Sequence, residues 1–425
     1  MNMKRYDTYK PTGIDWIGEV PETWHLSKMK YIAQYINGYA FKPTDWTDSG
    51  LPIIRIQDLT GTNDNPNYYD GQIPNKYLIK NGDVLISWAA TLDSFVWDRG
   101  DAWLNQHIFK TVVNESEVDK RYFVWLSKVA MSNMNNENKH GIMMEHVTSD
   151  IFDNYCIPIP PLSEQSKIAA YLDERCAGID KVLATQEKRI ALLQELKQSE
   201  ITQAVTRGLN PEARMKDSGV EWIGMVPEHW EVLQLRRFAK IYTGSTPPTN
   251  RKDYYDSEDV LWYTPSDFTY ETYRLGDSER KISSKAAKEF VGELFPKNTI
   301  LMTGIGLVGK IGITPDACYS NQQINAIVVD KKQSVGFVAY YLKGIKDIIL
   351  SLPKASLLPI LNQSETKQII VALPPIDEQI AIAEHLDRRC GEIDKQIGAV
   401  TKQIELLREY KQALITEVVT GKRKV

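Results

Sequence analysis

Several features are scarce or missing in this chain, and each absence narrows the class of protein. No run of about 18 apolar residues occurs, and the opening residues MNMKRYDTYKPTG lack the apolar stretch of a secretory signal, so we expect a cytoplasmic protein without membrane contact. The cysteines show neither C-x-x-C spacing nor a His-rich neighbourhood, which argues against a zinc site, so no metal is expected. We expect buried thiols at Cys156, Cys176, Cys318 and Cys390.

A basic excess is also missing, since the formal net charge is −4. Proteins that bind the phosphate backbone usually carry a surplus of Lys and Arg, so total charge alone argues against nucleic-acid binding. What the chain does contain is enough apolar material for real cores, with 42% hydrophobic residues, 10 Trp and 21 Tyr. Its 425 residues suit two domains better than one.

An internal repeat sets the architecture. Residues 10–24, KPTGIDWIGEVPETW, recur as KDSGVEWIGMVPEHW at 216–230, with 9 of 15 positions identical. A longer match pairs residues 160–206 with 374–420 at an offset of 214, with 24 identities in 47 positions. A weaker third match aligns 85–106 with 301–322, which indicates a common plan with divergent segments between strongly repeated ones.

The long repeat predicts two long helices. Residues 163–206 contain no Pro, apolar positions recur every three or four residues, and Gly208 ends the run. A rod of about 45 residues, near 65 Å, is not stable alone with an apolar seam in water, so we expect the two copies to pair antiparallel. The predicted seam consists of Cys176, Ile179, Leu183, Ile190 and Leu193 in the first helix and Cys390, Ile393, Ile397, Val400, Ile404 and Leu407 in the second. An ordinary helical hairpin is the alternative to a spacer.

The divergent segments predict a different kind of structure. Short β-prone runs such as LPIIRIQ, GDVLISW and NTILMTG lie between clusters of Gly, Pro, Asn and Asp. The predicted fold class is therefore α+β: two mixed α/β domains separated by a long antiparallel two-helix coiled-coil spacer, with a pseudo-twofold internal repeat. The predicted boundaries are residues 1–158 and 216–373 for the domains and 159–215 and 374–425 for the helical regions.

Three motifs make this plan resemble the specificity subunits of type I restriction-modification systems. W-x-G-x-V-P-x-x-W spans Trp16 to Trp24 and recurs from Trp222 to Trp230. I-P-x-P-P-L-x-E-Q begins at Ile157, with ALPPIDEQ as its second copy, and L-D-x-R-C-x-x-I-D-K follows in each long helix. The resemblance covers most of the chain and does not indicate which DNA sequence is read.

The resemblance implies that the chain is a non-catalytic DNA reader. Each domain would be a target recognition domain for one half of a bipartite site in double-stranded DNA, and the helices would set the gap between the halves. The implied partners are two methyltransferase subunits, which bind S-adenosylmethionine and methylate adenine, and restriction subunits that translocate and cleave using ATP and Mg. No cofactor is expected on this chain itself.

The strongest rival is a Gly-rich loop, GIGLVGK, that begins at Gly304 and matches G-x-G-x-x-G. A dinucleotide loop opens a helix, but IGITPDACY follows here, which favours a tight β-hairpin with Lys310 at its tip. The first copy has SWAATLDS at this place, without any Gly. Neither an Asn-Pro-Pro-aromatic motif nor a Walker A run occurs, and no catalytic constellation emerges; His107 and His146 are interpreted as structural.

Charge by segment sharpens the DNA question. Residues 222–373 carry a net charge of +2 and residues 16–158 carry −6, while both helical regions are neutral. Local loops must therefore read base edges, and partner subunits would supply much of the backbone affinity. The predicted readers are polar loop residues: Lys42, Arg55, Gln57 and Asp58 in the first domain and Thr243, Ser245, Thr264, Ser266, Asp267 and Lys310 in the second.

Two other hypotheses remain open at this point. A structural coiled-coil scaffold whose domains bind proteins would show no DNA sequence preference even with methyltransferase subunits added. An enzyme that uses the Gly-rich loop would bind a nucleotide and lose that binding on Gly306→Asp.

Overall fold

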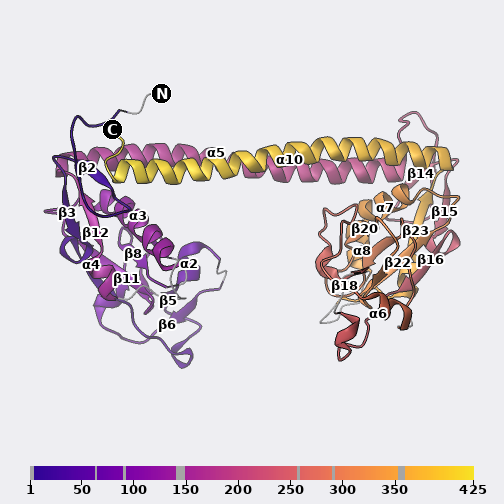
Figure 1. Ribbon diagram of the computed structural model, residues 1–425, viewed down its shortest axis with the longest axis horizontal. Coiled ribbons are helices and arrows are strands. Elements are labelled where there is room, and N and C mark those ends of the chain that lie inside the picture. Colours follow the sequence, from indigo (N-terminus) through magenta and orange to yellow (C-terminus); the bar gives the residue numbers. More distant parts are fainter. Residues whose placement is uncertain are drawn as a thin grey trace. The chain divides into compact units, whose positions relative to one another are not determined.

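The computed structural model describes residues 4–62, 65–89, 92–139, 149–255, 259–289, 292–352 and 359–425. The chain divides into two compact units, which we call unit 1 (residues 1–186 and 402–425) and unit 2 (residues 187–401). Each unit combines an α/β domain with a stretch of both long helices (Figure 1). His146 lies outside the described residues.

The domain of unit 1 is built on two four-stranded sheets. One sheet is antiparallel throughout, because its central strand pairs antiparallel with both neighbours and the edge strand β9 pairs antiparallel with β8. Its order is β4 (Ala33–Asn37), β11 (Ile108–Val113), β8 (Val84–Ser87) and β9 (Asp93–Val96). The other has the order β6 (Asn67–Tyr69), β5 (Leu51–Ile54), β10 (Ala102–Leu104) and β7 (Leu78–Ile79), with β5 and β10 parallel.

The domain of unit 2 repeats this topology. Its antiparallel sheet has the order β16 (Ala239–Thr243), β22 (Ile324–Val329), β19 (Ile300–Thr303) and β20 (Ile311–Ile313). Its second sheet has the order β18 (Lys281–Ile282), β17 (Val260–Tyr263) and β21 (Tyr319–Ser320), with the parallel pairing again between β17 and β21. The expectation of duplicated α/β domains rich in antiparallel strands is confirmed.

The lead-in and the strand before each long helix are also repeated. Each lead-in forms a two-stranded hairpin, and the strand before each helix pairs antiparallel with the strand after the lead-in. These elements are β1 (Tyr9–Pro11), β2 (Glu19–Pro21), β3 (His25–Lys28) and β12 (Cys156–Ile159), and then β13 (Met215–Asp217), β14 (Met225–Pro227), β15 (Glu231–Gln234) and β23 (Ile370–Leu373).

The two long helices are α5 (Leu162–Arg207) and α10 (Ile376–Val419), each unbroken across the boundary between the units. Ion pairs fix an antiparallel arrangement inside each unit. In unit 1, Lys411 Nζ lies 2.6 Å from Asp180 Oδ1, and in unit 2, Lys197 Nζ lies 2.7 Å from Asp394 Oδ1. Each of these pairs is the other one shifted by 214 residues, so the sequence repeat returns as a repeat of contacts. None of the predicted seam residues is exposed: Cys176, Cys390, Ile393, Val400 and Ile404 are buried, and Ile179, Leu183, Ile190, Leu193, Ile397 and Leu407 are half-buried.

The duplicated tryptophans explain why lead-in and helix are conserved as one block within this chain. Trp24 is fully buried and its Nε1 donates to Glu164 Oε2 at 3.1 Å, while Trp230 donates to Glu378 Oε2 at the same distance. A buried indole N–H without a partner would cost about 1–3 kcal/mol, so the helix glutamate and the lead-in tryptophan depend on each other.

Several remaining expectations are met. Cys176, Cys318 and Cys390 are buried and Cys156 is half-buried, and all of them are free thiols. In the described part of the chain no helix is both long and apolar enough to cross a membrane. No cluster of three or more metal-binding side chains occurs within the described residues.

Candidate nucleic-acid interface

The same tight corner follows the first strand of the antiparallel sheet in both domains. Gly38 and Gly244 come directly after β4 and β16, and a Cβ at either position would lie 1.9 Å from Asn105 O or 2.2 Å from Asn321 O. Glycine is therefore required at both corners. Each corner sends a long loop across the parallel strand pair, and these loops carry the candidate DNA-contacting residues.

In unit 2 the loop after this corner forms one wall of an open groove with a volume of about 790 Å³. The groove brings together two of the predicted readers, Thr264 and Ser266, with side chains that had not been predicted. These are hydroxyl, amide and cationic groups, the types that hydrogen-bond base edges and phosphates. They are Thr246, Thr249, Arg280, Lys281, Asn321 and Gln323.

The other predicted residues of unit 2 lie around this groove or away from it. Ser245 borders it, since its carbonyl accepts a hydrogen bond from Trp262 Nε1 at 3.2 Å. Thr243 is exposed and its hydroxyl donates to Asn325 at 3.3 Å. Lys310 is half-buried, and its Nζ donates to the carbonyl of Phe268 at 2.8 Å.

The Gly-rich segment is a hairpin, as expected, because β19 and β20 pair antiparallel from Ile300 and Ile313. The expected position of Lys310 at the tip is wrong. Thr303 N donates to Lys310 O at 2.9 Å, so these two residues close the loop and Lys310 sits at its base. The segment opens no helix, which removes the geometric basis for a dinucleotide loop.

Both parallel strands lead into the same kind of short turn. In unit 1, Arg55 N donates to Asp58 Oδ2 at 2.8 Å, and in unit 2, Thr264 N donates to Asp267 Oδ2 at 2.7 Å. Asp58 is buried and Asp267 is half-buried, so both carboxylates have a role in the fold. Gln57 and Ser266 precede these carboxylates at equivalent, exposed positions, and these two face solvent where DNA could be contacted.

In unit 1 the loop after Gly38 is braced by aromatic rings. Tyr39 packs edge-on against Phe41 and Tyr77, with ring centroids 4.9 Å and 5.4 Å apart. The Arg55 guanidinium lies over the Trp46 ring at 4.5 Å, and Lys42 is exposed on the same loop. The structure thus brings Arg55 and Gln57 together on one turn, with Lys42 on the adjoining loop.

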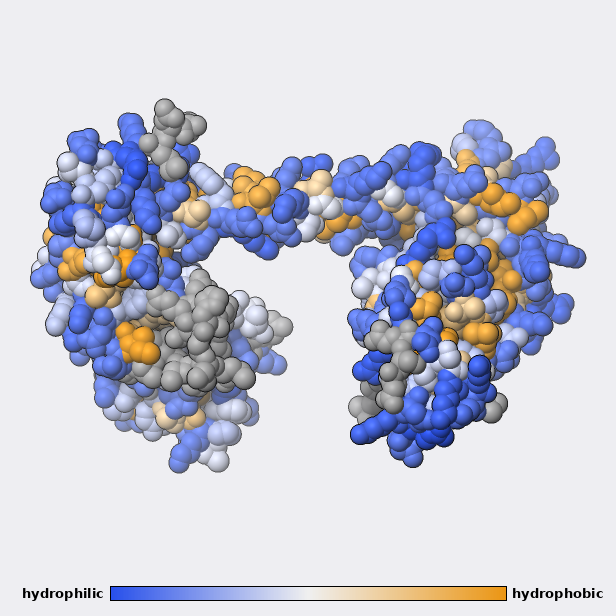
Figure 2. Space-filling model, in the orientation of Figure 1, coloured by the Kyte–Doolittle hydropathy of each residue, from blue (hydrophilic) through white to orange (hydrophobic). Residues whose placement is uncertain are grey.

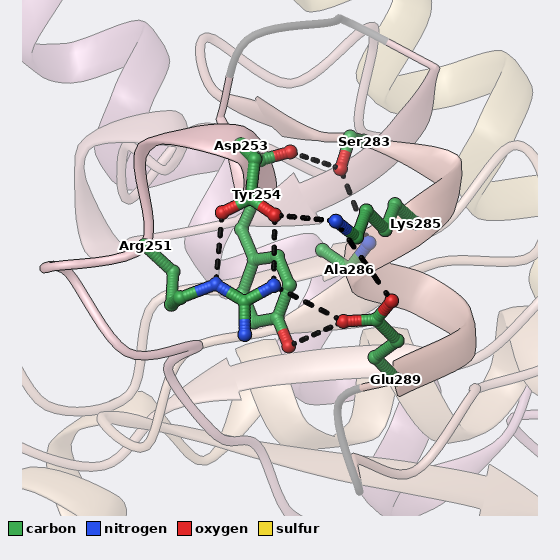
Figure 3. Close-up of polar contacts among 7 residues, drawn as sticks. All are labelled: Arg251, Asp253, Tyr254, Ser283, Lys285, Ala286 and Glu289. Atoms are coloured by element: carbon green, nitrogen blue, oxygen red, sulfur yellow. Dashed lines mark hydrogen bonds and ion pairs between the residues drawn. The ribbon is translucent and has the colours of Figure 1, made fainter.

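In unit 2 the equivalent loop is braced by charge (Figure 3). Arg251 makes two hydrogen bonds to the Asp253 carboxylate, at 2.9 Å and 2.7 Å, and a third to Glu289 at 3.2 Å. Lys285 lies 2.8 Å from Asp253, and hydrogen bonds from Arg251 and Lys285 hold the pKa of Asp253 well below its usual range. Arg251 also lies over the Tyr254 ring at 4.3 Å. This network fixes the loop to helix α6 (Ser284–Glu289).

Comparison with known proteins gives this architecture a family. The family model for the type I restriction modification DNA specificity domain matches twice, at residues 21–192 and 227–404. The chain therefore belongs to the type I restriction-modification DNA specificity family, whose members are the DNA-recognition subunits of these systems, here with two recognition domains.

Individual relatives agree along the whole chain. The type I restriction enzyme EcoBI specificity subunit of Escherichia coli is 26% identical over 96% of this chain and 88% of its own length. A putative MjaX specificity subunit of Methanocaldococcus jannaschii is 25% identical and matches over 96% of both chains. A solved chain from work on complex assembly of the type I R-M system shares the fold, with a TM-score of 0.72 at 16% identity, over 94% of this chain and 98% of its own.

Proposed function

We propose that each domain reads one half of a bipartite DNA target and that the paired helices set the gap between the halves. The observation that carries this proposal is the contrast between repeated and divergent parts. The frame repeats strand by strand, whereas the loop residues at the same corner are aromatic in unit 1 and ionic in unit 2. Two readers with one frame and different contact residues suit two different half-sites.

The charge distribution fits local reading with help from partners. The groove of unit 2 contains Arg280 and Lys281, but its rim also carries Glu279. Such a groove supplies hydrogen bonds for base edges and few phosphate contacts, so the isolated chain binds DNA weakly and modification subunits supply the clamp. Adenine methylation, with S-adenosylmethionine, belongs to these partners, and DNA cleavage with ATP and Mg belongs to restriction subunits; this chain supplies no catalytic group.

The outer surface of the helices supports docking of a partner present in two copies. Apolar side chains interrupt the hydrophilic surface of the helix pair on the face drawn in Figure 2. Leu192 and Leu196 are 55% and 45% exposed in unit 2, and the positions 214 residues later, Leu406 and Tyr410, are each 51% exposed in unit 1. Apolar groups repeated at the same positions and left in water indicate two equivalent contact surfaces.

Methylation mapping tests the reading function. Cells that express this chain with its modification subunit should show a bipartite adenine-methylation motif that is absent without the chain. If the complex assembles and no sequence preference appears, the scaffold hypothesis takes the place of the reader.

Shortening the helices tests the gap. Removal of one heptad from each helix at facing positions shortens the pair by about 10 Å, or roughly three base pairs. The expected motif keeps both half-sites and changes only the number of unspecified bases between them. An unchanged gap would contradict the spacer role.

A further inference from the structure

Each unit contains a hollow where its α/β domain faces the helix pair, and duplicated positions form both. The unit 1 hollow has a volume of about 680 Å³ and the unit 2 hollow about 320 Å³. The helices contribute the same set to both, at positions 214 residues apart: Lys197, Gln198, Ile201, Asp394 and Ile397 in unit 2, and Lys411, Gln412, Ile415, Asp180 and Leu183 in unit 1.

The domains also contribute an equivalent lysine. Helix α3 (Lys120–Lys139) in unit 1 and helix α7 (Val335–Gly344) in unit 2 are attached to the long helices in the same way. Asp119 N donates to Gln165 at 2.8 Å, and Ser334 N donates to Gln379 at 2.9 Å. One side chain per helix then bonds a helix aspartate, Trp125 to Asp173 and Tyr340 to Asp387. These attachments bring Lys128 and Lys343 to their respective hollows.

The charges in the unit 2 hollow favour an incoming anion. Lys343 donates to the carbonyls of Tyr270 and Thr272 at 2.9 Å and 2.6 Å. Burial, followed by repulsion from Lys197, lowers the pKa of Lys343 to about 8, although Glu271 and Asp394 act in the opposite direction. A carboxylate placed near these ammonium groups would relieve both effects.

The floor of each hollow is apolar, and this selects the kind of anion. Ile201, Ile311 and Ile397 line the unit 2 hollow, and Leu92, Trp125 and Ile415 line the unit 1 hollow. A DNA phosphate has no apolar part to place on such a floor. A protein segment with a large apolar side chain beside an Asp or Glu satisfies the floor and the lysines together.

We infer that each hollow takes one copy of the same acidic, apolar-anchored segment, presented by the modification subunit. This inference rests on the proposed function, which supplies a partner in two copies. The hollows lie on the domain side of the helices, so the segment is a second point of attachment beside the exposed apolar positions at Leu192 and Leu406. A partner held at both points is fixed relative to the recognition domain as well as to the helices.

Single-hollow variants test the inference through stoichiometry. Lys343→Met and Lys128→Met remove one ammonium each and keep an unbranched side chain. Native mass spectrometry with increasing modification subunit should show one copy binding as in the wild type and the other roughly tenfold or more weakly. The double variant should weaken both copies. Lys181→Met and Lys395→Met are matched controls, because both lysines are exposed at duplicated helix positions outside the hollows.

A second pair of variants keeps the test decisive if a lysine substitution lowers stability. Gln194→Trp and Arg408→Trp place bulk on an exposed helix position that lines each hollow and leave both ion pairs intact. Wild-type affinity for both copies in the Met and the Trp variants overturns the inference. So does a loss of DNA affinity with unchanged partner binding, which would mark the hollows as phosphate sites. Loss of the methylation motif in a wild-type complex that still binds two copies would contradict the proposed function and leave the hollows supported.

Discussion

The loops after Gly38 and Gly244 occupy the same place in the two domains, yet different physical forces brace them. In unit 1, Tyr39, Phe41 and Tyr77 pack their rings against one another. In unit 2, Arg251, Asp253, Lys285 and Glu289 form an ion-pair network. The backbone corner is common and the brace is free to differ. A duplicated frame of this kind lets each loop acquire its own contact residues without disturbing the sheet that carries it.

The largest expected effect falls on the common corner. Gly38→Ala and Gly244→Ala each place a Cβ against a backbone carbonyl, so the free energy of unfolding should fall by about 3 kcal/mol in either domain. Chemical denaturation combined with hydrogen exchange of each domain measures this. Gly276→Ala is the control, because a Cβ there meets nothing within 4 Å. A near-neutral effect at either corner would break the equivalence.

A smaller loss is expected where the lead-in meets the helix. Glu164→Ala and Glu378→Ala leave the buried Trp24 and Trp230 indole N–H groups without their acceptor, which should cost about 1–3 kcal/mol in each unit. The exposed Glu174→Ala is the matched control on the same helix. Destabilisation at only one of the two glutamates would show that the lead-ins are not held alike.

The braces themselves should respond differently to removal of an arginine. Arg251→Met deletes the centre of the charge network, so amide exchange in residues 244–255 should rise several-fold. Arg55→Met removes only a cation above Trp46 and leaves the ring cluster in place, so residues 38–47 should change little. Hydrogen exchange with mass spectrometry on both variants makes the comparison, and equal responses of the two loops would contradict it.

Salt should separate the loops in the unmodified chain. Exposed ion pairs are screened as ionic strength rises from about 0.05 M to about 0.5 M, whereas ring packing is not weakened. Exchange in residues 244–255 should therefore increase over this range, and exchange in residues 38–47 should stay constant. The Arg251→Met variant serves as the control, since it should have lost the salt response.

The smallest expected effect concerns acid. The pKa of Asp253 is lowered in the folded chain, so its contribution to stability is present above its ordinary pKa of 3.8 and is lost as the pH falls through the lowered value. Protection of residues 244–255 should fall at the acid end, and Asp253→Asn should flatten this dependence. An unchanged acid profile in the variant would remove Asp253 from the account.

The sequence was sufficient for the frame because the frame is periodic and duplicated. Heptad spacing predicted α5 and α10, and the repeated Trp and Glu positions marked elements that turned out to contact each other. The β-prone run before Pro315 correctly predicted a hairpin in place of a nucleotide loop. Lys310 was misplaced because loop length alone does not show which residues close a hairpin, and Thr303 closes this one.

The candidate site was harder to predict, since its residues come from distant segments. Thr264 and Ser266 share a groove with Arg280 and Asn321, and no local pattern links these positions. Arg251, Asp253, Lys285 and Glu289 are ordinary surface charges in the sequence and become a network only when α6 packs beside the loop. For the predicted readers, contact with DNA stays a prediction.

Methylation mapping of one-domain variants tests the central claim, which is that one duplicated frame carries two independent readers. Ser266→Ala with Arg280→Ala should alter one half of the methylated motif and leave the other half and the gap unchanged, while Lys42→Ala with Arg55→Ala should alter only the opposite half. Changes in both halves from one pair of substitutions, or an unchanged motif from both pairs in intact complexes, would contradict the account.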